Sequence, residues 1–489
     1  MLRVLVLPSA IYITPYTKFA VPAIEKSLSV YDVVAKYYTS KLYSFEIEDP
    51  VKKTGVLKIP RGYGLDTVEA AIQQMGLPYT VVDYTSRYAE PRRINLIMKK
   101  EPRNEVQRNS LAFLKRPDRQ LFLCLDVGTG KTYCGVNRAV TSGMATMVIS
   151  YSLSNQWLEK ILEYTNAVNG KDVIMISSSN YLENCVCGIE KQKAAIYLVS
   201  ISTLDSYRKL HGPESLQKVV DNLGIGIKIF DEAHVRFLQF NELDLNMQVF
   251  QTIYLSATPG RSNYNENKVF NKMYSHVETF GSFTSKMNNF YCIRYVTIDS
   301  HSTAKDRVGL KTVRGFSSLK YIDWLFTKYH NEMCEMIMYY LKPILQEDST
   351  GKVLIVIDWL KYLMSAKKYF EENYPEFSCG AFCAIEHDKS IRQKELDKRI
   401  ILGTIGSMQN GRDIANLRAV FCCTQFSSSI VARQLLGRLR KIPDKTVHYF
   451  DMADRSVPDT MSERFRRNQV FESKANGLIR TDDIDLDRF

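Results

Sequence analysis

The sequence predicts an α/β protein with two tandem domains built on parallel sheets, preceded by a small α+β domain. From Asn104 onward, short apolar runs alternate with helical patterns, which is typical of parallel strands linked by helices. The same alternation begins again at Lys352, where KVLIVID starts a new buried strand. A third observation indicates the position of a candidate functional site: the apolar run LFLCL, beginning at Leu121, stops at a glycine-rich turn.

Length and composition indicate a multidomain globular protein with a basic surface. At 489 residues, the chain is long enough for about three domains of roughly 100 to 200 residues each. Its 65 Lys and Arg residues against 53 Asp and Glu residues leave a net charge of +12, which favours a polyanionic partner such as nucleic acid. The same charge spread over this length also fits a basic surface that binds no partner.

The sequence argues against a membrane protein and against a scaffold held by disulfides. No apolar run reaches the roughly 18 residues needed to cross a bilayer, and Pro8 and Pro15 interrupt the apolar N-terminus. The ten cysteines lack the spacing of a disulfide framework. We therefore expect no membrane contact, reduced thiols and a cytoplasmic location.

The chain divides into five predicted regions. They are an N-terminal accessory domain (1–100), a first parallel-sheet domain (101–290), a linker or helical insertion (291–345), a second parallel-sheet domain (346–455) and a C-terminal tail (456–489). In the N-terminal domain, basic and aromatic residues are mixed, a composition that suits phosphate contact and base stacking but equally a solvated basic face. This cluster comprises Lys52, Lys53, Lys58, Arg61, Tyr63, Arg87, Tyr88, Arg92, Arg93, Lys99 and Lys100.

The turn LDVGTGKT, residues 125–132, is interpreted as a phosphate cradle. Gly128 and Gly130 allow the backbone to curl so that its N–H groups point at phosphate oxygens. Lys131 would then reach the β and γ phosphates, and Thr132 the magnesium ion. The pattern G-x-x-x-x-G-K-[ST] is met except at its first position, where Leu125 replaces glycine.

A second chemical landmark is the sequence DEAH, which directly follows a predicted strand over 225–230. An aspartate at the end of a buried strand, here Asp231, can hold magnesium, and the adjacent Glu232 can accept a proton from an attacking water. Another predicted strand over 252–255 ends in Ser256, Ala257 and Thr258. The order of these segments after the glycine-rich turn makes the site prediction specific.

In order, the segments resemble the motifs of superfamily 2 helicases. The series consists of Gln107, LDVGTGKT, NQW, SISTL, DEAH, SATP, the spacing Thr404/Gly411/Asp413, and QLLGRLRK. The resemblance covers about residues 104 to 455 and is greatest to the XPB-like viral and phage branch. It implies two RecA-like domains with ATP and Mg²⁺ held in the cleft between them.

The resemblance also implies a role for each matching residue. Gln107 would read adenine, Lys131 and the glycine-rich loop would bind the phosphates, and Glu232 would activate the hydrolytic water. The loop residues would be Gly128, Thr129 and Gly130, the magnesium ligands Thr132 and Asp231, and further cofactor-binding residues Gly411 and Asp413. The residues that couple the nucleotide state to the second domain would be His234, Ser256 and Thr258, with Gln434. The arginines at the γ-phosphate would be Arg438 and Arg440.

The last motif departs from the family pattern Q-x-x-G-R-x-x-R. Here a helix predicted over 431–439 carries Gln434 and Arg438, but the final arginine, Arg440, falls one place early, and Lys441 occupies its usual slot. Lysine lacks the bidentate fork of arginine. Either Arg440 takes the role through a small helical adjustment, or Lys441 serves with weaker geometry.

We therefore expect an ATP-dependent DNA helicase or translocase that remodels forks, junctions or R-loops in replication or recombination. Its partners would be nucleic acid, DNA ahead of RNA, and proteins of replication or transcription. For a viral or phage protein, the location would be the cytoplasm or nucleoid of the host. Two alternatives stay open: a transcript-release or RNA-directed ATPase, and a nucleotide-gated nucleic-acid-binding module with weak ATPase activity.

Overall fold

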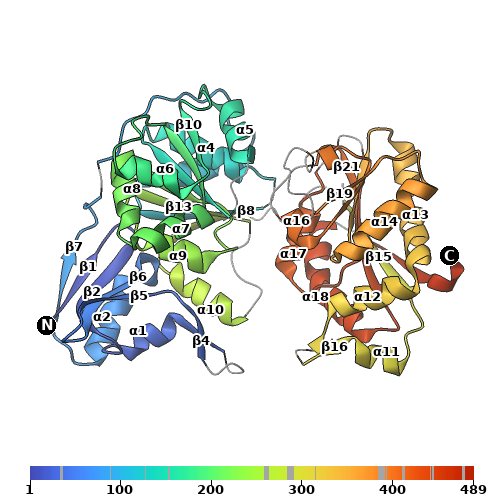
Figure 1. The fold of residues 1–489 in the computed structure, drawn as a ribbon, viewed down its shortest axis with the longest axis horizontal. Coiled ribbons are helices and arrows are strands. Elements are labelled where there is room, and N and C mark those ends of the chain that lie inside the picture. The colour runs from blue at the N-terminus through green and yellow to red at the C-terminus, as the bar shows by residue number, and fades with distance from the viewer. Residues whose placement is uncertain are drawn as a thin grey trace. The chain divides into compact units, whose positions relative to one another are not determined.

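The protein folds into two units, Met1–Phe283 and Thr284–Phe489, which are described here one after the other (Figure 1). This is a computed structural model of residues 1–489. It describes all residues except 33–36, 89, 127, 152–154, 258–263, 283–290, 314, 384–390, 392–393, 410–413, 441, 443–444 and 476–478.

The first unit opens with a mixed five-stranded sheet in the order β5-β6-β2-β1-β7. All its strand pairs are antiparallel except β1 with β7. Its elements are β1 (Leu2–Val6), β2 (Ala10–Thr17), α1 (Pro22–Ser27), the hairpin β3 (Ser29–Asp32) and β4 (Tyr37–Lys41), β5 (Ser44–Asp49), β6 (Thr54–Pro60), the 3₁₀ turn η1 (Arg61–Tyr63), α2 (Leu65–Gln74) and β7 (Tyr79–Asp83). The predicted α+β region is thus present, and Gly64 is the N-cap residue of α2.

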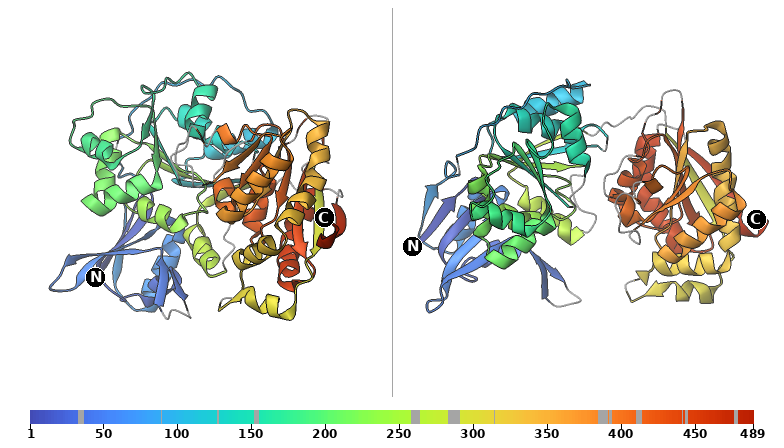
Figure 2. Two further views of the ribbon diagram at one scale, coloured as in Figure 1. Left: turned by 45° about the vertical axis from the view of Figure 1, so that its right-hand side comes forward. Right: turned by 45° about the horizontal axis from the view of Figure 1, so that its top comes forward.

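An all-parallel sheet of seven strands follows, in the order β10-β11-β9-β12-β13-β8-β14. Its strands are β8 (Gln120–Leu125), β9 (Thr146–Ser150), β10 (Val173–Ile176), β11 (Ile196–Ser200), β12 (Ile227–Phe230), β13 (Gln251–Ser256) and β14 (Glu278–Ser282). Its helices are α3 (Glu105–Leu114), α4 (Lys131–Thr141), α5 (Asn155–Tyr164), α6 (Ser179–Val186), α7 (Ile201–His211), α8 (Ser215–Leu223), α9 (Phe237–Asp244) and α10 (Tyr264–Met273). Helices lie on both faces of the sheet (Figures 1 and 2).

Alternate residues of the parallel strands belong to two different cores, because successive side chains of a strand point to opposite faces. Along β8, Leu121, Leu123 and Leu125 pack with α3, α4 and α5. Phe122 and Cys124 pack on the other face, with α6 to α10 and with the N-terminal sheet. The N-terminal domain therefore shares a hydrophobic core with the first parallel sheet.

A buried polar network strengthens the same junction. The backbone N–H of Ser9 donates to Gln248 Oε1 at 2.9 Å, and the fully buried ammonium of Lys228 on β12 lies 2.9 Å from the Ser9 hydroxyl oxygen. Lys228 also pairs with the buried carboxylate of Asp244. A buried lysine is tolerated only when such partners replace its water. The N-terminal domain and the first parallel sheet thus pack as one body.

The second unit contains another all-parallel sheet, in the order β19-β20-β18-β21-β22-β15-β23. Its strands are β15 (Tyr291–Asp299), β18 (Lys352–Val356), β19 (Cys379–Phe382), β20 (Ile400–Gly403), β21 (Leu417–Cys422), β22 (Val447–Asp454) and β23 (Ile479–Asp485). Its helices are α11 (Ala304–Gly309), α12 (Ser318–Lys328), α13 (His330–Glu347), α14 (Leu360–Asn373), α16 (Ile405–Gln409), α17 (Ser429–Leu436) and α18 (Pro458–Ala475), with a short hairpin of β16 (Lys311–Thr312) and β17 (Gly315–Phe316). The predicted fold class, with two RecA-like domains and an α+β N-terminal region, is confirmed.

Two segments outside the predicted sheet domains contribute strands to this second sheet. Strand β15 lies beside β22, and β23 follows it at the edge of the sheet. Most residues of β15 are buried, as expected of an interior strand. Helices α12 and α13 pack in the same core as β18 and β20. Among the described residues, no helix is long and apolar enough to span a membrane.

Helix α18 is held on the sheet by two buried arginines that share one carboxylate. Arg464 Nε lies 3.2 Å from Asp451 Oδ2, and Arg467 contacts both oxygens of Asp451 at 3.1 Å. Asp451 is 1% exposed and Arg467 is fully buried. Two guanidinium groups therefore depend on a single buried carboxylate on β22.

Asp451→Asn is expected to destabilise the second unit by about 3–5 kcal/mol, because it leaves two buried guanidinium groups without their counter-charge. Urea unfolding followed by circular dichroism measures the loss. Lys368→Ala, which removes an exposed pair with Glu372, is the control and should change the free energy of unfolding by less than about 1 kcal/mol. Equal unfolding midpoints for Asp451→Asn and the unaltered protein would contradict the assignment.

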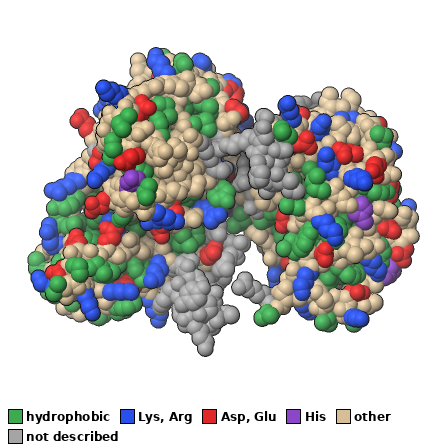
Figure 3. All heavy atoms as spheres, in the orientation of Figure 1, with side chains coloured by type: hydrophobic (Ala, Val, Ile, Leu, Met, Phe, Trp, Pro, Cys, Tyr) green, Lys and Arg blue, Asp and Glu red, His purple; other side chains and the backbone are tan. Residues whose placement is uncertain are grey.

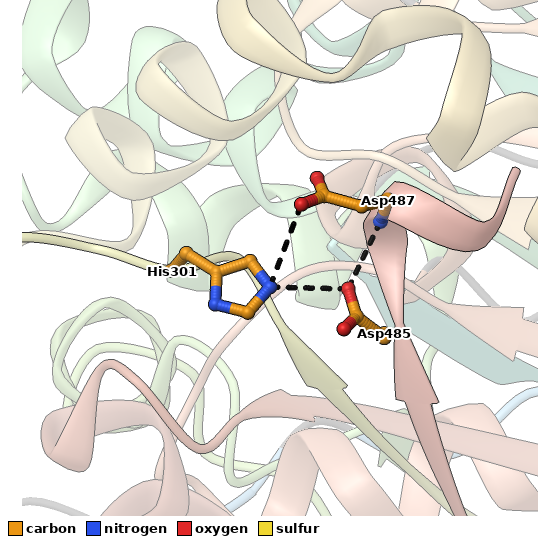
Figure 4. Close-up of side chains that lie close together, drawn as sticks. All are labelled: His301, Asp485 and Asp487. Carbon is orange, nitrogen blue, oxygen red and sulfur yellow. Dashed lines mark hydrogen bonds and ion pairs between the residues drawn. The ribbon is translucent and has the colours of Figure 1, made fainter.

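An exposed histidine joins the end of β23 to the turn after β15 (Figure 4). His301 Nε2 lies 3.1 Å from Asp485 Oδ1 and 3.7 Å from Asp487 Oδ2. The hydrogen bond with Asp485, followed by the negative charge of Asp299, raises the pKa of His301 above its ordinary value of 6.5. This contact is therefore charged at mildly acidic pH.

We expect His301 to titrate above 6.5 in the folded protein, and Asp485→Asn to lower its pKa. A raised folded-state pKa means that the stabilisation is fully present below the unfolded pKa and is lost as pH rises through the folded pKa. NMR titration of the imidazole, assigned by its disappearance in His301→Gln, measures both values. A midpoint that Asp485→Asn leaves unchanged would refute the contact.

Candidate nucleotide-binding and hydrolysis site

Three neighbouring strands of the first parallel sheet end at the same edge. In the sheet register, Ser256 at the end of β13 pairs with Cys124 of β8, and Phe230 at the end of β12 pairs with Tyr254 of β13. The glycine-rich loop, DEAH and the segment starting at Ser256 follow these strand ends. They lie at the carboxyl edge, where parallel sheets bind ligands.

The glycine-rich loop adopts a conformation that favours glycine. Gly128 and Gly130 have φ angles of 81° and 109°, in the left-handed region. A Cβ atom on Gly130 would collide with the side-chain amide of Gln107. Helix α4 begins at Lys131 with no side-chain cap and no acidic residue in its first turn. Its N-terminal N–H groups and the positive end of its dipole therefore suit an anion.

Lys131 is nearly buried at the start of α4. Its Nζ donates to the backbone oxygen of Leu125 at 3.0 Å, at the end of β8. An ammonium group has three N–H donors, so this bond leaves two for phosphate oxygens. Its positive charge favours the ionised form of Asp231 and so opposes part of the rise in the pKa of that group.

Gln107, expected to read adenine, contacts the loop in this structure. The side chain is 2% exposed; its Nε2 donates to Thr129 O at 3.1 Å, and its Oε1 accepts from Arg103 N at 2.9 Å. Asn104 caps α3 by accepting from the backbone N–H of Gln107 at 2.9 Å. Gln107 therefore braces the glycine-rich loop, a contact that sequence spacing does not reveal.

Both carboxylate oxygens of Asp231 are oriented by hydrogen bonds. Oδ2 accepts from the indole nitrogen of Trp157 at 2.8 Å, and Oδ1 accepts from the backbone N–H of Glu232 at 3.0 Å. Burial, followed by the charge of Glu232, raises the pKa of Asp231 to about 6, while the bond from Trp157 lowers it. Glu232 itself has a φ of 50°, an unusual value for a residue other than glycine that recurs at functional sites.

His234 connects DEAH to the end of β13. The ring is 1% exposed, and its Nδ1 lies 2.8 Å from Ser256 Oγ and 3.4 Å from Glu232 Oε2. His234 and Ser256, both predicted as coupling residues, are therefore in direct contact. Thr258, the third residue expected to couple the nucleotide state, lies outside the described residues.

Trp157 is a site residue that the motif analysis left without a role. It lies on α5 and is 4% exposed, and a Cβ atom on Gly135 of α4 would approach its ring to 2.8 Å. In the sequence, the NQW segment resembles a helicase motif and its tryptophan fits an apolar helix face. The indole N–H bond to Asp231 depends on tertiary packing.

This group of residues fits a magnesium–nucleotide complex. An uncapped helix N-terminus and a lysine suit phosphates, and a hydroxyl with an oriented carboxylate supplies the oxygen ligands that Mg²⁺ prefers. The hydroxyl is that of Thr132, on the first turn of α4, and the carboxylate is that of Asp231.

The predicted arginines of the second unit lie beyond their helix. Helix α17 ends at Leu436, with the weak helix former Gly437 as C-cap, and does not reach Leu439 as predicted. Gln434 is on the helix; Arg438, 4% exposed, follows it, and Arg440 donates to Gly437 O. Gly411, Asp413 and Lys441 are outside the described residues, so the choice between Arg440 and Lys441 stays a prediction.

Part of the sequence matches a known protein family, and the fold is similar to those of solved structures. Residues 97–261 match the family described as type III restriction enzyme, res subunit. No curated protein shows a significant match to the sequence. Among solved structures, the chain is similar to T4 UvsW, with 14% sequence identity over 99% of each chain and a TM-score of 0.36. It is also similar to a fragment of a putative HsdR subunit of a type I restriction enzyme from Vibrio vulnificus, with 13% identity over 78% of this chain and 68% of the other and a TM-score of 0.50. A third similar structure is Saccharomyces cerevisiae Dbp5, with 15% identity over 78% of this chain and 90% of the other and a TM-score of 0.52.

The likenesses to the HsdR fragment and to Dbp5 show the fold, two RecA-like domains on parallel sheets. The family match spans the glycine-rich loop, NQW, DEAH and Ser256, and these segments meet at one sheet edge. Residues 97–261 are therefore similar to the family described as type III restriction enzyme, res subunit, and the two parallel-sheet domains share their fold with the HsdR fragment and with Dbp5.

Proposed function

We propose that this protein is an ATP-dependent DNA helicase or translocase that remodels forks, junctions or R-loops in viral or phage replication or recombination. The observation that carries the proposal is the meeting of Lys131, Asp231 and Glu232 at one sheet edge. Proteins of replication or transcription would be its partners, in the cytoplasm or nucleoid of the host.

In this proposal, the first domain binds the nucleotide and activates water. Lys131 and the first-turn N–H groups of α4 bind phosphate oxygens, and Glu232 takes the proton of the attacking water. Magnesium, when bound, neutralises charge on the phosphates. The remaining roles are phosphate binding by Gly128, Thr129 and Gly130, adenine recognition by Gln107, and magnesium binding by Thr132 and Asp231.

Residues of both domains would transmit the nucleotide state. The bond between His234 and Ser256 connects the water-activating segment to β13, and Arg438 contacts the γ-phosphate, where an arginine is worth about 10³ or more in rate. The other proposed participants are Thr258, Gly411, Asp413, Gln434, and Arg440 or Lys441. The protein would grip the phosphate backbone without reading its sequence.

An RNA-directed ATPase is the second candidate. Dbp5, which shares the fold, is bound to RNA and ADP–BeF₃ in its solved structure. The two functions differ in which polymer stimulates hydrolysis. ATPase assays with duplex DNA, single-stranded DNA, forked DNA, Holliday junctions, RNA and RNA:DNA hybrids separate them, and stimulation by RNA alone would replace the DNA proposal.

Lys131→Ala is expected to lower nucleic-acid-stimulated ATP hydrolysis by about 10²–10³-fold, because it removes a positioned donor to the charged phosphates. Steady-state phosphate release with and without forked DNA measures this. Lys171→Ala, an exposed lysine of the same unit, is the control. Retained stimulation in Lys131→Ala would refute the assignment, and single-turnover behaviour of the unaltered protein would favour a nucleotide-gated binding module.

Trp157→Phe is expected to weaken magnesium binding at the nucleotide site by about 10-fold, because it removes the indole donor that orients Asp231 while keeping an aromatic ring beside Gly135. Titration of Mg²⁺ against a fluorescent ADP analogue measures this directly. Nucleotide affinity without magnesium should stay unchanged, and Trp324→Phe in the second unit is the control. The same magnesium affinity in Trp157→Phe would show that the bond does not position Asp231.

A further inference from the structure

A hollow of about 590 Å³ lies in the first unit, between the N-terminal domain and α10. Helix α10 packs against β3 and against η1, and Figure 1 shows it beside α1 and β4. The polar side chains around the hollow come from α1, β3 and α10; they are Lys26, Ser27, Ser29, Lys268, Asn271 and Lys272. Segments about 240 positions apart in the sequence therefore build one surface.

The hollow is electropositive. Three of its lining residues are lysines and none is acidic. Lys268 and Lys272 are four residues apart on α10 and so lie on one face, where like charges repel. In the part of the chain that the structure describes, no carboxylate forms an ion pair with Lys26 or Lys272. A bound anion would relieve the repulsion that this arrangement creates.

The acidic neighbour of Lys26 does not neutralise the hollow directly. Glu25 is buried, and its Oε1 accepts hydrogen bonds from the Tyr16 hydroxyl at 2.9 Å and from the Phe19 N–H at 2.6 Å. Its carboxylate is therefore committed to the interior of the N-terminal domain. Lys26, on the same helix, is exposed.

Two members of the basic cluster recognised in the sequence are used inside the fold. Lys58 is buried and pairs with Glu46 at 2.7 Å, and Arg61 donates to the backbone oxygen of Leu7 at 2.7 Å. On the face drawn in Figure 3, Lys and Arg side chains are interspersed with Asp and Glu. A hollow lined by three lysines and no acid is therefore distinct from its surroundings.

We propose that this hollow binds the phosphodiester backbone of nucleic acid. The inference rests on the proposed function and names the surface of the first unit that holds the substrate. Lysine ammonium groups neutralise phosphates without reading bases. The Ser29 hydroxyl donates to the backbone oxygen of Glu25, and the Ser27 hydroxyl bonds the Tyr63 hydroxyl, so both hydroxyls have partners within the protein. The contact between the hollow and the phosphates is therefore ionic and independent of the base sequence.

The place of α10 in the chain links this surface to the nucleotide site. Helix α10 is the next helix after β13, whose last residue, Ser256, bonds His234 of DEAH. Its buried residues Val269 and Phe270 pack in the core that also contains Phe230, the last residue of β12. A backbone held by Lys268 and Lys272 therefore contacts a helix packed on the strands that carry the hydrolytic residues.

The double variant Lys26→Ala/Lys272→Ala tests the proposal. We expect nucleic-acid affinity at low salt to fall at least about 10-fold, and the slope of log affinity against log salt concentration to become shallower by about 2, near one unit per lost phosphate contact. Fluorescence anisotropy of labelled duplex and single-stranded DNA over a salt series measures both. The matched control, Lys171→Ala/Lys191→Ala, removes the same charge from exposed lysines near β10 and α6 and should keep the original slope.

Three outcomes decide the inference. Restoration of the slope by Lys26→Arg/Lys272→Arg would support a phosphate contact. An unchanged slope in the alanine variant, or an equal change in the control, would overturn the inference. ATP hydrolysis without nucleic acid should be the same in all variants, because none of these lysines is at the nucleotide site. Failure of the unaltered protein to bind or respond to any nucleic acid would instead refute the proposed function.

Discussion

The orientation of the Asp231 carboxylate depends on the packing of α5 beside β12 in the first parallel-sheet domain. Strand β12 sets the position of the Asp231 backbone. The indole N–H of Trp157 on α5 donates to Oδ2, and the backbone N–H of Glu232 donates to Oδ1. Strand β12 and Glu232 flank Asp231 in the sequence, whereas Trp157 lies 74 residues away from it. Since burial makes the ionised carboxylate costly, the two donors and the nearby charge of Lys131 offset part of that cost. Positive charge at this edge, whether from lysine or from a bound cation, favours the ionised form.

The N-terminal domain is joined to that sheet by more than a linker. One face of β8 packs into the same core as the N-terminal strands, and the buried ammonium of Lys228, on the strand that directly precedes Asp231, contacts Ser9. A domain attached through a shared core moves with its neighbour as one body. Substrate held by the N-terminal domain or by α10 would therefore be held by the body that carries the proposed nucleotide site.

The sequence predicts the parts of this fold whose local pattern is strong. Strands β8, β12 and β13 are apolar runs ending in chemical motifs, so both their positions and their common edge could be expected. Strand β23, with the sequence IRTDDID, has no apolar pattern, and it is part of the sheet because β15 offers a free edge. The bracing of the loop by Gln107 and the donor role of Trp157 depend on side chains meeting across the fold. Spacing along a chain does not encode such meetings.

The arginines and lysines show most clearly that spacing along the chain does not encode side-chain contacts. The same kind of side chain is buried in an ion pair at one position and exposed to solvent at another. Arg464 and Arg467 look in the sequence like a basic tail, yet both are buried against Asp451. Lys58 looks like part of a binding cluster, yet it is paired inside the N-terminal domain. The difference lies in desolvation: a cation without a nearby carboxylate remains stable only where water, or a ligand's phosphate, can reach it. The distribution of carboxylates around each cation, more than the number of cations, thus decides where a polyanion can bind.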